Sequence, residues 1–596
     1  MSAPQDDGML VGSTTEKGES NMSIPPETEV KTSTRSRKKP LQFYLAFLSL
    51  VIMVLIASID ATALSVAIPV IIRQLNGTSL DGFWANLTYL LAVVITQPLY
   101  VSASDIIGRK PMLNTAYFFY FIGSIIFATG PSIGAVIAGR LVQGFGGGGL
   151  DVLNEVLICD ITSLKERPLW IGLMAIPLAV GTILGPILGA AFTQYASWRY
   201  VSRRNYHIRL VPEAERTQLR MHLRLDFKAD TLSSCHQIGW INLPLVALSF
   251  GLAAYALRLK PVEGPLKVRL RRLDWVGMLL FTIGSAAFAL PLSWGGALYP
   301  WSSFRTILPL IIGFLVLVVF GVYEARPAEP VVPYRIISSR TAVATVIGAT
   351  LQGIVLYPLL LYLPLFFQAV YLETPLQAAV SILPLCAGVI AAAFLSGLAV
   401  EHLRHYRWQL WVGWIATALG IGLFGLWGSN FSRAETAIFQ LLAAVGLGVY
   451  FAVPAIAMQA SAKVEDQGLA VGTMVTFRLF GGLIGLAIGS TIFSNSFSSS
   501  ISALDLQSLP QYVADLGNSA NAVAFITELR DIDIPDELRS AIRMAYNGAM
   551  RVLWYFLAGV SVVGLITSVF VQNLSIETED VGKQHIQETP RAEHTL

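Results

Sequence analysis

The sequence predicts an all-α, polytopic membrane protein with fourteen membrane-spanning helices. Two observations come from composition: 54% of the 596 residues are hydrophobic and only 13% are charged, whereas soluble domains carry about 25% charged residues. The third is the length of the apolar runs. Runs of about 20 residues, enough to cross the hydrocarbon core, recur from Leu41 to Val571. A chain with so little polar surface cannot cover itself in water.

Fourteen apolar runs can be delimited, and we expect one spanning helix in each. They cover residues 43–72, 84–104, 112–130, 133–158, 169–193, 238–258, 275–295, 303–323, 342–369, 377–400, 408–428, 435–460, 468–494 and 550–572. Because the number is even, both termini are expected on the same side of the membrane.

Lysine and arginine residues in the short loops predict which side that is, because cytoplasmic loops carry an excess of both. One set of loops is rich in them: Arg109 and Lys110; Lys165 and Arg167; Lys260, Lys267, Arg269, Arg271 and Arg272; Arg326, Arg335 and Arg340; Arg404 and Arg407. The polar segment 1–40, expected to be a disordered tail, ends in a basic cluster on that side. We therefore expect residues 1–40 and the C-terminal tail 573–596 in the cytoplasm, and 495–549 as an outer loop.

The expected location is the plasma membrane, with a vacuolar or vesicle membrane as the alternative. Two sequons fall on the predicted outer side, at Asn76 and Asn430. Both are candidates for glycosylation.

Several classes of function are not indicated. A formal net charge of +3 gives no indication of nucleic-acid binding, and the three cysteines lack metal-ligand spacing. The glycine run 146–149 lacks the Lys-Ser/Thr ending of a phosphate-binding loop, and no nucleophile elbow is present. We expect neither an enzyme nor a bound metal or cofactor. We expect a monomer whose partners are a small-molecule substrate, protons and the lipid bilayer.

The loop between spans two and three carries a glycine turn between an acid and two bases, Asp105, Gly108, Arg109 and Lys110. Such a turn lets two helices pack closely, with the acid near a helix N-terminus and the bases near an acidic partner. This stretch resembles the cytoplasmic signature of the major facilitator superfamily. It departs from the pattern at Val101, where a glycine is expected, and this puts close packing of the second span in question.

Spans four and five carry two further motifs. Arg140-Leu-Val-Gln143-Gly144 resembles the span-four arginine motif of the superfamily, which is linked there to proton transfer. A cation inside a span is costly unless it faces the bundle interior. In span five, a proline and small residues at helix-contact spacing resemble the antiporter motif, typical of exporters: Gly181, Gly185, Pro186 and Gly189.

The resemblance covers most of residues 41–573. Other stretches that carry it begin at Asp60, Trp294, Tyr362 and Arg478. They are similar to the fourteen-span drug:proton antiporters, and among these to fungal toxin and multidrug efflux pumps. The resemblance implies two six-helix bundles, formed by residues 41–258 and 342–572, with two extra helices in 259–341 between them.

Ionisable residues inside the spans are candidates for function, because they are costly in lipid. Asp60 lies midway along span one and Arg140 is its natural counter-charge, so we expect both to take part in proton coupling. A purely structural Asp60 is the alternative. Asp151 and Glu155 share one helical face. We expect them to pair with the bases of the loop after span two and to latch the inner gate, or else to lie solvated at the inner mouth.

Substrate contacts are expected at the midplane between the bundles. The candidates are polar or aromatic residues of spans two, nine and thirteen: Gln97, Gln352, Tyr357, Tyr362, Gln368 and Arg478. Aromatic residues inside spans also serve packing, which is the alternative for the tyrosines.

Residues 201–237 do not fit an outer loop. They hold seven Lys/Arg, four Asp/Glu and three of the seven histidines. Val201-Ser202 can be encoded by a consensus splice donor, and Gln237 by a consensus acceptor. We expect a translated intron here, with a genuine outer-loop insertion as the alternative.

The function implied is proton-coupled export of a small, largely apolar metabolite, toxin or drug. One alternative is proton-coupled transport of basic amino acids or siderophores, for which acidic residues should cluster at the midplane. An alternative of another class is a membrane sensor that binds its ligand without moving it.

Overall fold

The computed structural model describes residues 39–75, 79–185, 187–188, 240–295, 299–428, 431–502, 525–526, 529–530, 534–577 and 584. Within these ranges the chain is almost entirely helical, and the predicted all-α class is confirmed. The predictions for most of the N-terminal tail, for residues 201–237 and for the sequons at Asn76 and Asn430 lie outside the described residues.

The first bundle is built from six helical segments. These are α1 (Leu41–Gln74), α2 (Ser79–Ile107), α3 (Arg109–Thr129), α4 (Ile133–Ile161), α5 (Arg167–Leu173, in an apolar span that continues to Gly185) and the helix Trp240–Ala256. Helix α4 is central, because α1, α2 and α3 all pack against it.

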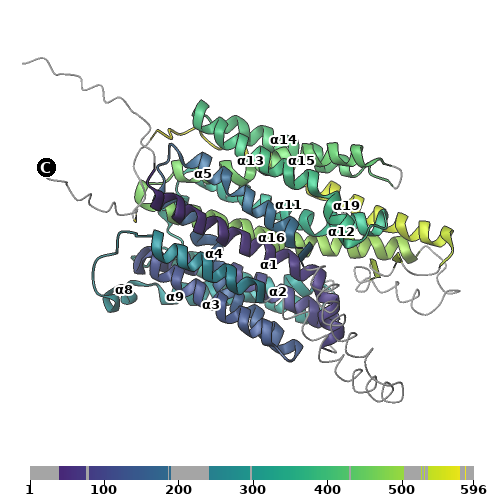
Figure 1. Ribbon diagram of the computed structural model, residues 1–596, viewed down its shortest axis with the longest axis horizontal. Helices are drawn as coiled ribbons and strands as arrows, with labels where there is room; N and C mark the ends of the chain where they lie inside the picture. The colour runs from purple at the N-terminus through teal and green to yellow at the C-terminus, as the bar shows by residue number, and fades with distance from the viewer. Residues whose placement is uncertain are drawn as a thin grey trace, which may run out of the picture. The chain divides into compact units, whose positions relative to one another are not determined.

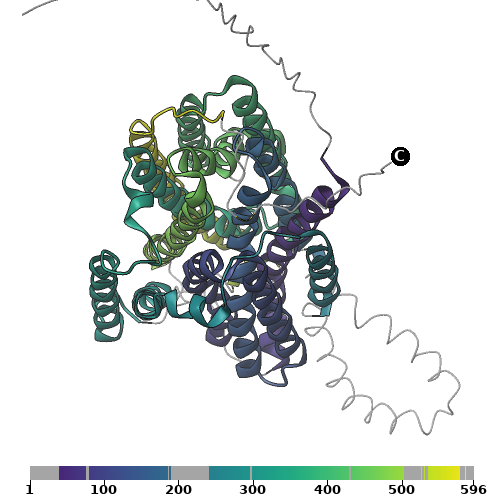
Figure 2. The same cartoon turned by 90° about the vertical axis from the view of Figure 1, so that its left-hand side faces the viewer.

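The second bundle and the extra helices follow. The second bundle holds α11 (Arg340–Val370), the short α12 (Pro375–Ser381), α13 (Leu383–Leu403), α14 (Arg407–Phe424), α15 (Arg433–Ala460), α16 (Gln467–Ser502) and α19 (Asp536–Ser568). Between the bundles in sequence come α8 (Leu266–Arg272), α9 (Trp275–Trp294) and α10 (Phe304–Tyr323). The helices run roughly alongside one another (Figure 1), and α9 and α10 form a pair beside the bundles (Figure 2).

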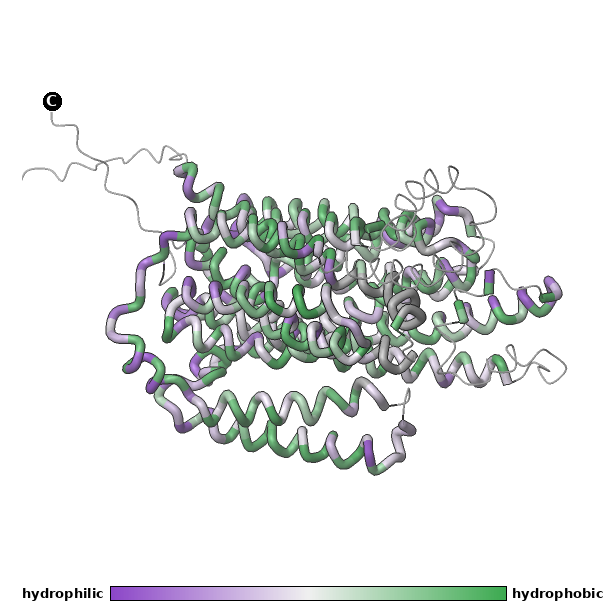
Figure 3. Tube along the Cα trace, turned by 60° about the horizontal axis from the view of Figure 1, so that its bottom comes forward, coloured by the Kyte–Doolittle hydropathy of each residue, from purple (hydrophilic) through white to green (hydrophobic). Residues whose placement is uncertain are grey.

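Local sequence signals account for several helix starts. The Ser339 side chain accepts the N–H of Ala342 at the start of α11. At the start of α15, Ser432 and Glu435 form a reciprocal capping box. Along their lengths the helices are apolar, with polar residues gathered at their ends (Figure 3). Large apolar side chains stay exposed on α10, as expected for a surface that faces lipid.

Each predicted span contains a helix. Eleven helices of the described residues are long and apolar enough to cross a membrane, and the helix Trp240–Ala256 is a shorter apolar one. Helices α4 and α14 are not among the eleven. The count of fourteen crossings therefore stays a prediction.

The largest difference concerns the predicted outer segment 495–549. Helix α16 continues to Ser502, and α19 begins at Asp536, well before the predicted start at residue 550. The added turns are amphipathic: Phe497 and Tyr546, for example, are buried and stack on each other at 4.4 Å. A search for continuous apolar runs misses such turns, because their outer faces are polar.

Glycines allow the closest helix contacts. A Cβ atom built on Gly146 of α4 would lie 2.2 Å from the backbone nitrogen of Tyr120 in α3. A Cβ atom on Gly353 of α11 would lie 1.8 Å from the carbonyl oxygen of Arg478 in α16. No larger residue fits at either contact, so these glycines of spans four and nine serve helix packing.

Candidate functional site

The loops rich in lysine and arginine lie at one end of the helices, called the basic end below. It comprises the turn at Gly108 and the connections 162–166, 257–274, 324–339, 404–406 and 461–466. Three polar groupings stand out: one inside the first bundle, in the half of the helices away from this end, and two that join the bundles between the middle of the helices and this end.

The first grouping is an ion pair buried in the first bundle. Arg140 Nη1 of α4 donates to Asp60 Oδ2 of α1 at 2.5 Å. Asp60 Oδ1 accepts from the amides of Gln143 at 3.2 Å and Asn242 at 2.8 Å. The structure thus places the two residues that we assigned to proton coupling in direct contact, and supplies the carboxylate with two further donors.

Aromatic rings pack against the guanidinium group of Arg140. Its guanidinium carbon lies 4.2 Å from the centre of the Tyr89 ring and 5.7 Å from that of Phe127, a cation–π arrangement. Within the described part of the chain, Arg140 Nε and Nη2 have no hydrogen-bond partner. A buried cation with unused donors is costly, so its place in the bundle depends on the negative charge of Asp60.

The second grouping, called the central cluster below, consists of Gln97, Asp151, Glu155, Tyr357 and Arg478. Arg478 Nη2 of α16 donates to Glu155 Oε1 of α4 at 2.9 Å, so this ion pair joins the two bundles. Gln97 Nε2 of α2 donates to Asp151 Oδ2 at 2.7 Å. The ring of Tyr357 packs over Gly482, one turn beyond Arg478. The Arg478–Glu155 ion pair is partly accessible, because 12% of the Arg478 side chain and 17% of the Glu155 side chain are exposed.

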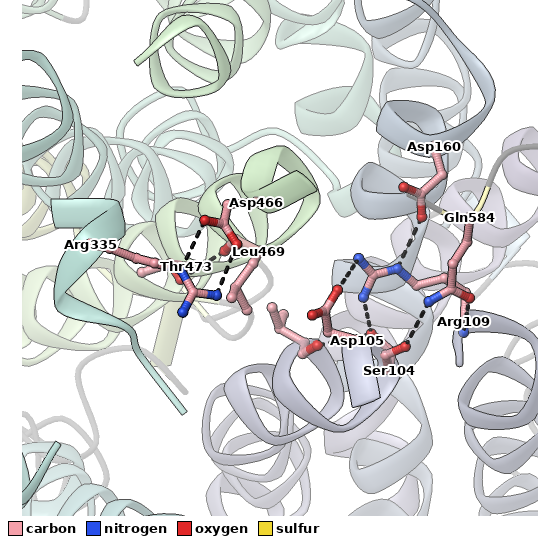
Figure 4. Close-up of polar contacts among 10 residues, drawn as sticks. Ser104, Asp105, Arg109, Asp160, Arg335, Asp466, Leu469, Thr473 and Gln584 are labelled. Carbon is pink, nitrogen blue, oxygen red and sulfur yellow. Dashed lines mark hydrogen bonds and ion pairs between the residues drawn. The ribbon is translucent and has the colours of Figure 1, made fainter. Parts of the chain in front are cut away.

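The expected partners of Asp151 and Glu155 were wrong. Arg109 instead donates from Nε to Asp160 Oδ2 at 3.0 Å and from Nη2 to Asp105 Oδ1 at 3.2 Å (Figure 4). Asp160 lies five residues beyond Glu155, about 7.5 Å further along the helix axis, and this rise brings it level with the loop after α2. The acid at the inner end of span four is therefore Asp160.

The turn at Gly108 is tightly organised. Gly108 has φ +116°, a conformation that residues with a Cβ rarely adopt. Beyond it, Arg109 Nη1 donates to Ser104 Oγ at 2.7 Å. Gln584 of the C-terminal tail accepts from the Arg109 backbone N–H at 2.8 Å and donates to the Ser104 carbonyl at 3.3 Å (Figure 4). Lys110 Nζ donates to the Ala254 carbonyl, which joins the turn to the helix Trp240–Ala256.

Close packing at Val101 is preserved by a glycine on the facing helix. Val101 is buried, and a Cβ atom built on Gly472 of α16 would lie 2.5 Å from Val101 Cγ2. The small residue expected at position 101 is thus supplied from the second bundle. The packing of α2 that the departure from the motif put in question is maintained.

The third grouping joins the bundles at the basic end through Arg167. Its Nη1 donates to Gln459 Oε1 at 2.7 Å and to Gln467 Oε1 at 2.9 Å, both in the second bundle. Its Nη2 donates to the carbonyls of Cys159 and Thr162. Arg167 is fully buried, and among the described residues its hydrogen-bond partners are all neutral.

The other predicted residues take packing roles or lie apart. Gly181 fits against α1, since a Cβ atom there would lie 2.4 Å from Ser58 Cβ, and Gly185 is buried. Tyr362 packs on Phe493 with ring centres 5.3 Å apart. Gln352 is buried in α11, and Gln368 bonds weakly to its own helix at Pro364. Pro186 and Gly189 lie outside the described residues.

Sequence reasoning missed several residues that complete these groupings: Asn242, Asp160, Arg167, Gln459 and Gln467. Asp160 could have been found as the last acid before the loop that ends span four. Nothing in the residues next to Asn242 indicates Asp60 as its partner. The glutamines carry no signal of their own, because an amide is not diagnostic until its partner is known.

Comparison with known proteins decides the family. Residues 258–594 match the family described as "Fungal trichothecene efflux pump (TRI12)", and residues 50–202 match the "Major Facilitator Superfamily". The chain belongs to the fungal efflux-pump family of the major facilitator superfamily. It is a multi-pass membrane transporter and not an enzyme.

Similar transporters cover nearly the whole chain. The "MFS-type transporter sphD" of Aspergillus fumigatus is 41% identical over 96% of this chain and 93% of its own. The "Efflux pump FUS6" of Gibberella moniliformis is 28% identical over 94% of this chain and 92% of its own. The solved structure of the proton:xylose symporter XylE covers 90% of this transporter and 98% of its own chain, with a TM-score of 0.52 and 12% identity. A bacterial homologue of the lysosomal transporter Spinster gives the same coverage and TM-score at 16% identity. Both structures confirm the major facilitator fold.

Proposed function

We propose that this transporter exports a small, largely apolar metabolite, toxin or drug in exchange for protons. We assign it to the plasma membrane as a monomer, with the basic end and both termini in the cytoplasm. Export of metabolites is supported by the description of the matching family as a trichothecene efflux pump and by the name of the similar Gibberella moniliformis efflux pump. An apolar cargo is favoured because Arg478 is already paired with Glu155 and so offers no free cation to an anionic ligand.

The buried Asp60–Arg140 pair is the observation that carries proton coupling. Asp60 accepts three hydrogen bonds, one of them from the Arg140 cation, and such bonds favour its ionised form. A proton on Asp60 would leave Arg140 buried without a counter-charge, which costs several kcal/mol. Proton binding and the Arg140 contact therefore oppose each other. A rearrangement of α1 against α4 is needed when the proton arrives, and such a link is what coupling requires.

Alternating access requires the two bundles to part at one end while they meet at the other. In this structure they meet at the basic end, through Arg167 and through the packing of Gly397 in α13 against the backbone of Pro168. With the basic end in the cytoplasm, this arrangement is closed towards the cytoplasm. Export then requires the Glu155–Arg478 pair and the Arg167 contacts to break together, so that cargo can enter from inside.

The test compares pH-driven efflux by the wild type and Asp60→Asn in proteoliposomes. Asparagine keeps the shape of the protonated acid but cannot release a proton, so uphill export should be lost. Exchange of cargo down its own gradient should survive. A trichothecene, the compound class for which the matching family is named, is the first cargo to load, followed by a panel of apolar fungal metabolites.

Asp536→Asn is the matched control, because Asp536 is 96% exposed and remote from the pair. It should export like the wild type. Full pH-driven export by Asp60→Asn would place the proton site elsewhere. If the wild type instead moved cargo towards the side assigned to the cytoplasm, the proposed direction of transport would be wrong.

A further inference from the structure

Two carboxylic acids meet where the extra helices α9 and α10 reach the basic end. Asp274 precedes the first residue of α9, and Glu324 follows the last residue of α10, so both lie outside the apolar spans. Only 7% of Asp274 and 4% of Glu324 is exposed. Neither residue takes part in the three groupings described above.

Each acid has one satisfied oxygen and one unsatisfied oxygen. Asp274 Oδ1 accepts from the backbone N–H of Gly277 at 2.8 Å and from the hydroxyl of Tyr323 at 3.2 Å. Glu324 Oε2 accepts from the N–H of Val332 at 3.0 Å. The remaining atoms, Asp274 Oδ2 and Glu324 Oε1, are buried and have no hydrogen-bond partner among the described residues.

The two unsatisfied oxygens face the same point. A Cβ atom built on Gly277 would lie 2.1 Å from Asp274 Oδ2 and 2.9 Å from Glu324 Oε1. Since both oxygens lie within 2.9 Å of that position, they are at most about 5 Å apart. Two ionised carboxylates this close in a buried place disfavour each other, unless a cation or a proton lies between them.

No base compensates the pair within the described part of the chain. Arg272 makes an ion pair with Glu329 at the surface, and Arg335 is engaged by Asp466. Arg326 acts electrostatically on Tyr323. Helices α2 and α16 also pack against α9: α2 brings Asp105 to this end, where Arg109 binds it, and Arg478 of α16 is held by Glu155.

We propose that Asp274 and Glu324 together form a proton-binding site, in which Glu324 Oε1 carries the proton and donates it to Asp274 Oδ2. The shared proton satisfies both orphan oxygens with one hydrogen bond and leaves the pair with a single negative charge. Burial, with a smaller contribution from the charge of Asp274, raises the pKa of Glu324 to about 7, against the opposing effect of the Val332 N–H. The site therefore exchanges its proton near neutral pH.

The site lies at the start of the connection between the extra helices and the second bundle. Glu324 accepts a hydrogen bond from the N–H of Val332. Three residues later, Arg335 binds Asp466, in the turn between α15 and α16, through two hydrogen bonds of 2.9 Å (Figure 4). Loss of the proton leaves two like charges side by side in a buried place. It should therefore loosen the basic end of α9 and α10 and the start of this connection.

The test uses the full-length protein in detergent and needs no transport assay, so its outcome is independent of the proposed function. Infrared difference spectra between acidic and alkaline samples should show a protonated carboxyl band that disappears with a midpoint near pH 7. Glu324→Gln should remove this band. Asp274→Asn should lower its midpoint, since the amide takes away the neighbouring charge. The matched control, Glu329→Gln at the surface of the same connection, should leave the band unchanged.

Thermal unfolding gives a second readout. A pKa raised in the folded protein contributes stability that is fully present below the ordinary value near 4.5 and is lost as the pH rises through about 7. The melting temperature of the wild type should therefore fall between pH 5 and 8 relative to that of Glu324→Gln. A midpoint that stays near 4.5, a band that survives Glu324→Gln, or a midpoint that moves with added Na⁺, Mg²⁺ or Ca²⁺ would overturn the proton site, the last by showing that a metal cation occupies it.

Discussion

Two buried arginines at the basic end are satisfied in opposite ways. Arg109 is held by two carboxylates, Asp105 and Asp160, which belong to the same bundle as Arg109 itself. Arg167 reaches across the interface, where it is held by the neutral side chains of Gln459 and Gln467. Hydrogen bonds with charged groups on both sides are stronger than those with a neutral partner. At the basic end, the joint within the first bundle thus uses ion pairs, and the Arg167 contact between the bundles uses amides.

Replacing Asp160 should therefore damage the first bundle. Asp160→Asn removes the countercharge nearest to Arg109 in a fully buried place, and we expect a loss of about 3–5 kcal/mol in stability. Asp466→Asn, which breaks the more exposed pair with Arg335, should cost no more than about 1 kcal/mol. Denaturation of the purified variants in detergent measures both. Equal losses would show that Arg109 does not depend on Asp160.

At the scale of elements, the glycine that allows two helices to pack closely can belong to either helix of the contact. In the loop motif of the first bundle the small residue is expected in α2, but α2 has Val101 and the facing helix α16 has Gly472. What packing requires is one small residue per contact, on either partner. A motif read on a single helix can therefore be incomplete while the contact is intact.

This compensation can be tested with a double-mutant cycle. Gly472→Ala places a methyl group 2.5 Å from the stiff Val101 side chain, and overpacking of this kind typically costs about 1–3 kcal/mol. Val101→Ala in the same chain should recover part of that loss. Gly559→Ala in α19 is the control, because no atom lies within 4 Å of its added methyl group. If both single alanine variants at Gly472 and Gly559 melt alike, the contact with Val101 is not tight.

At the scale of the whole molecule, polar contacts between the bundles lie between the central cluster and the basic end. The Glu155–Arg478 pair lies nearer the middle of the helices, and the Arg167 contacts lie nearer the basic end. The two sets of contacts share no residue. Breaking one of them therefore leaves the other in place, and the bundles stay closed. Parting of the bundles should expose Cys159, whose Sγ now accepts a hydrogen bond from Gln459 across the interface.

Cys159 is thus a native reporter for opening at the basic end. The test uses a background with Cys235→Ser and Cys386→Ser. In it, Arg167→Ala should speed modification of Cys159 by a membrane-impermeant maleimide several-fold, because the closed state loses its contacts nearest the basic end. Arg335→Ala, which removes a surface contact between the connection 324–339 and the second bundle, is the control and should leave the rate unchanged. A rate that Arg167→Ala leaves unchanged would remove this residue from the gate.

The proposed orientation of the molecule rests on the basic loops and can be tested directly. Tags at both termini should be protected from protease in intact cells, and a tag within residues 503–524 should be cleaved. The physical reason is that positively charged loops are retained on the cytoplasmic side during insertion. Cleavage of the N-terminal tag in intact cells would reverse the assignment of the basic end.

The sequence by itself determined the class, the positions of the helices and the family resemblance. Apolar length is a local property, and so is the charge of a loop; both can be read without knowing any contact. The ends of α16 and α19 were misjudged because their outer turns are amphipathic and the expected signal was a continuous apolar run.

Only the tertiary structure decided which polar groups meet. Asp60 and Arg140 could be paired from the sequence because each is a rare charge inside a span, and an isolated buried charge must find its opposite. Helix α4 carries three acids, Asp151, Glu155 and Asp160. Which of them pairs with Arg109 depends on the position of each acid along the axis of α4. Arg167 meets Gln459 and Gln467, which lie 292 and 300 positions away in the chain. Such contacts are set by how the bundles pack, and packing is a property of the whole fold that no local pattern contains.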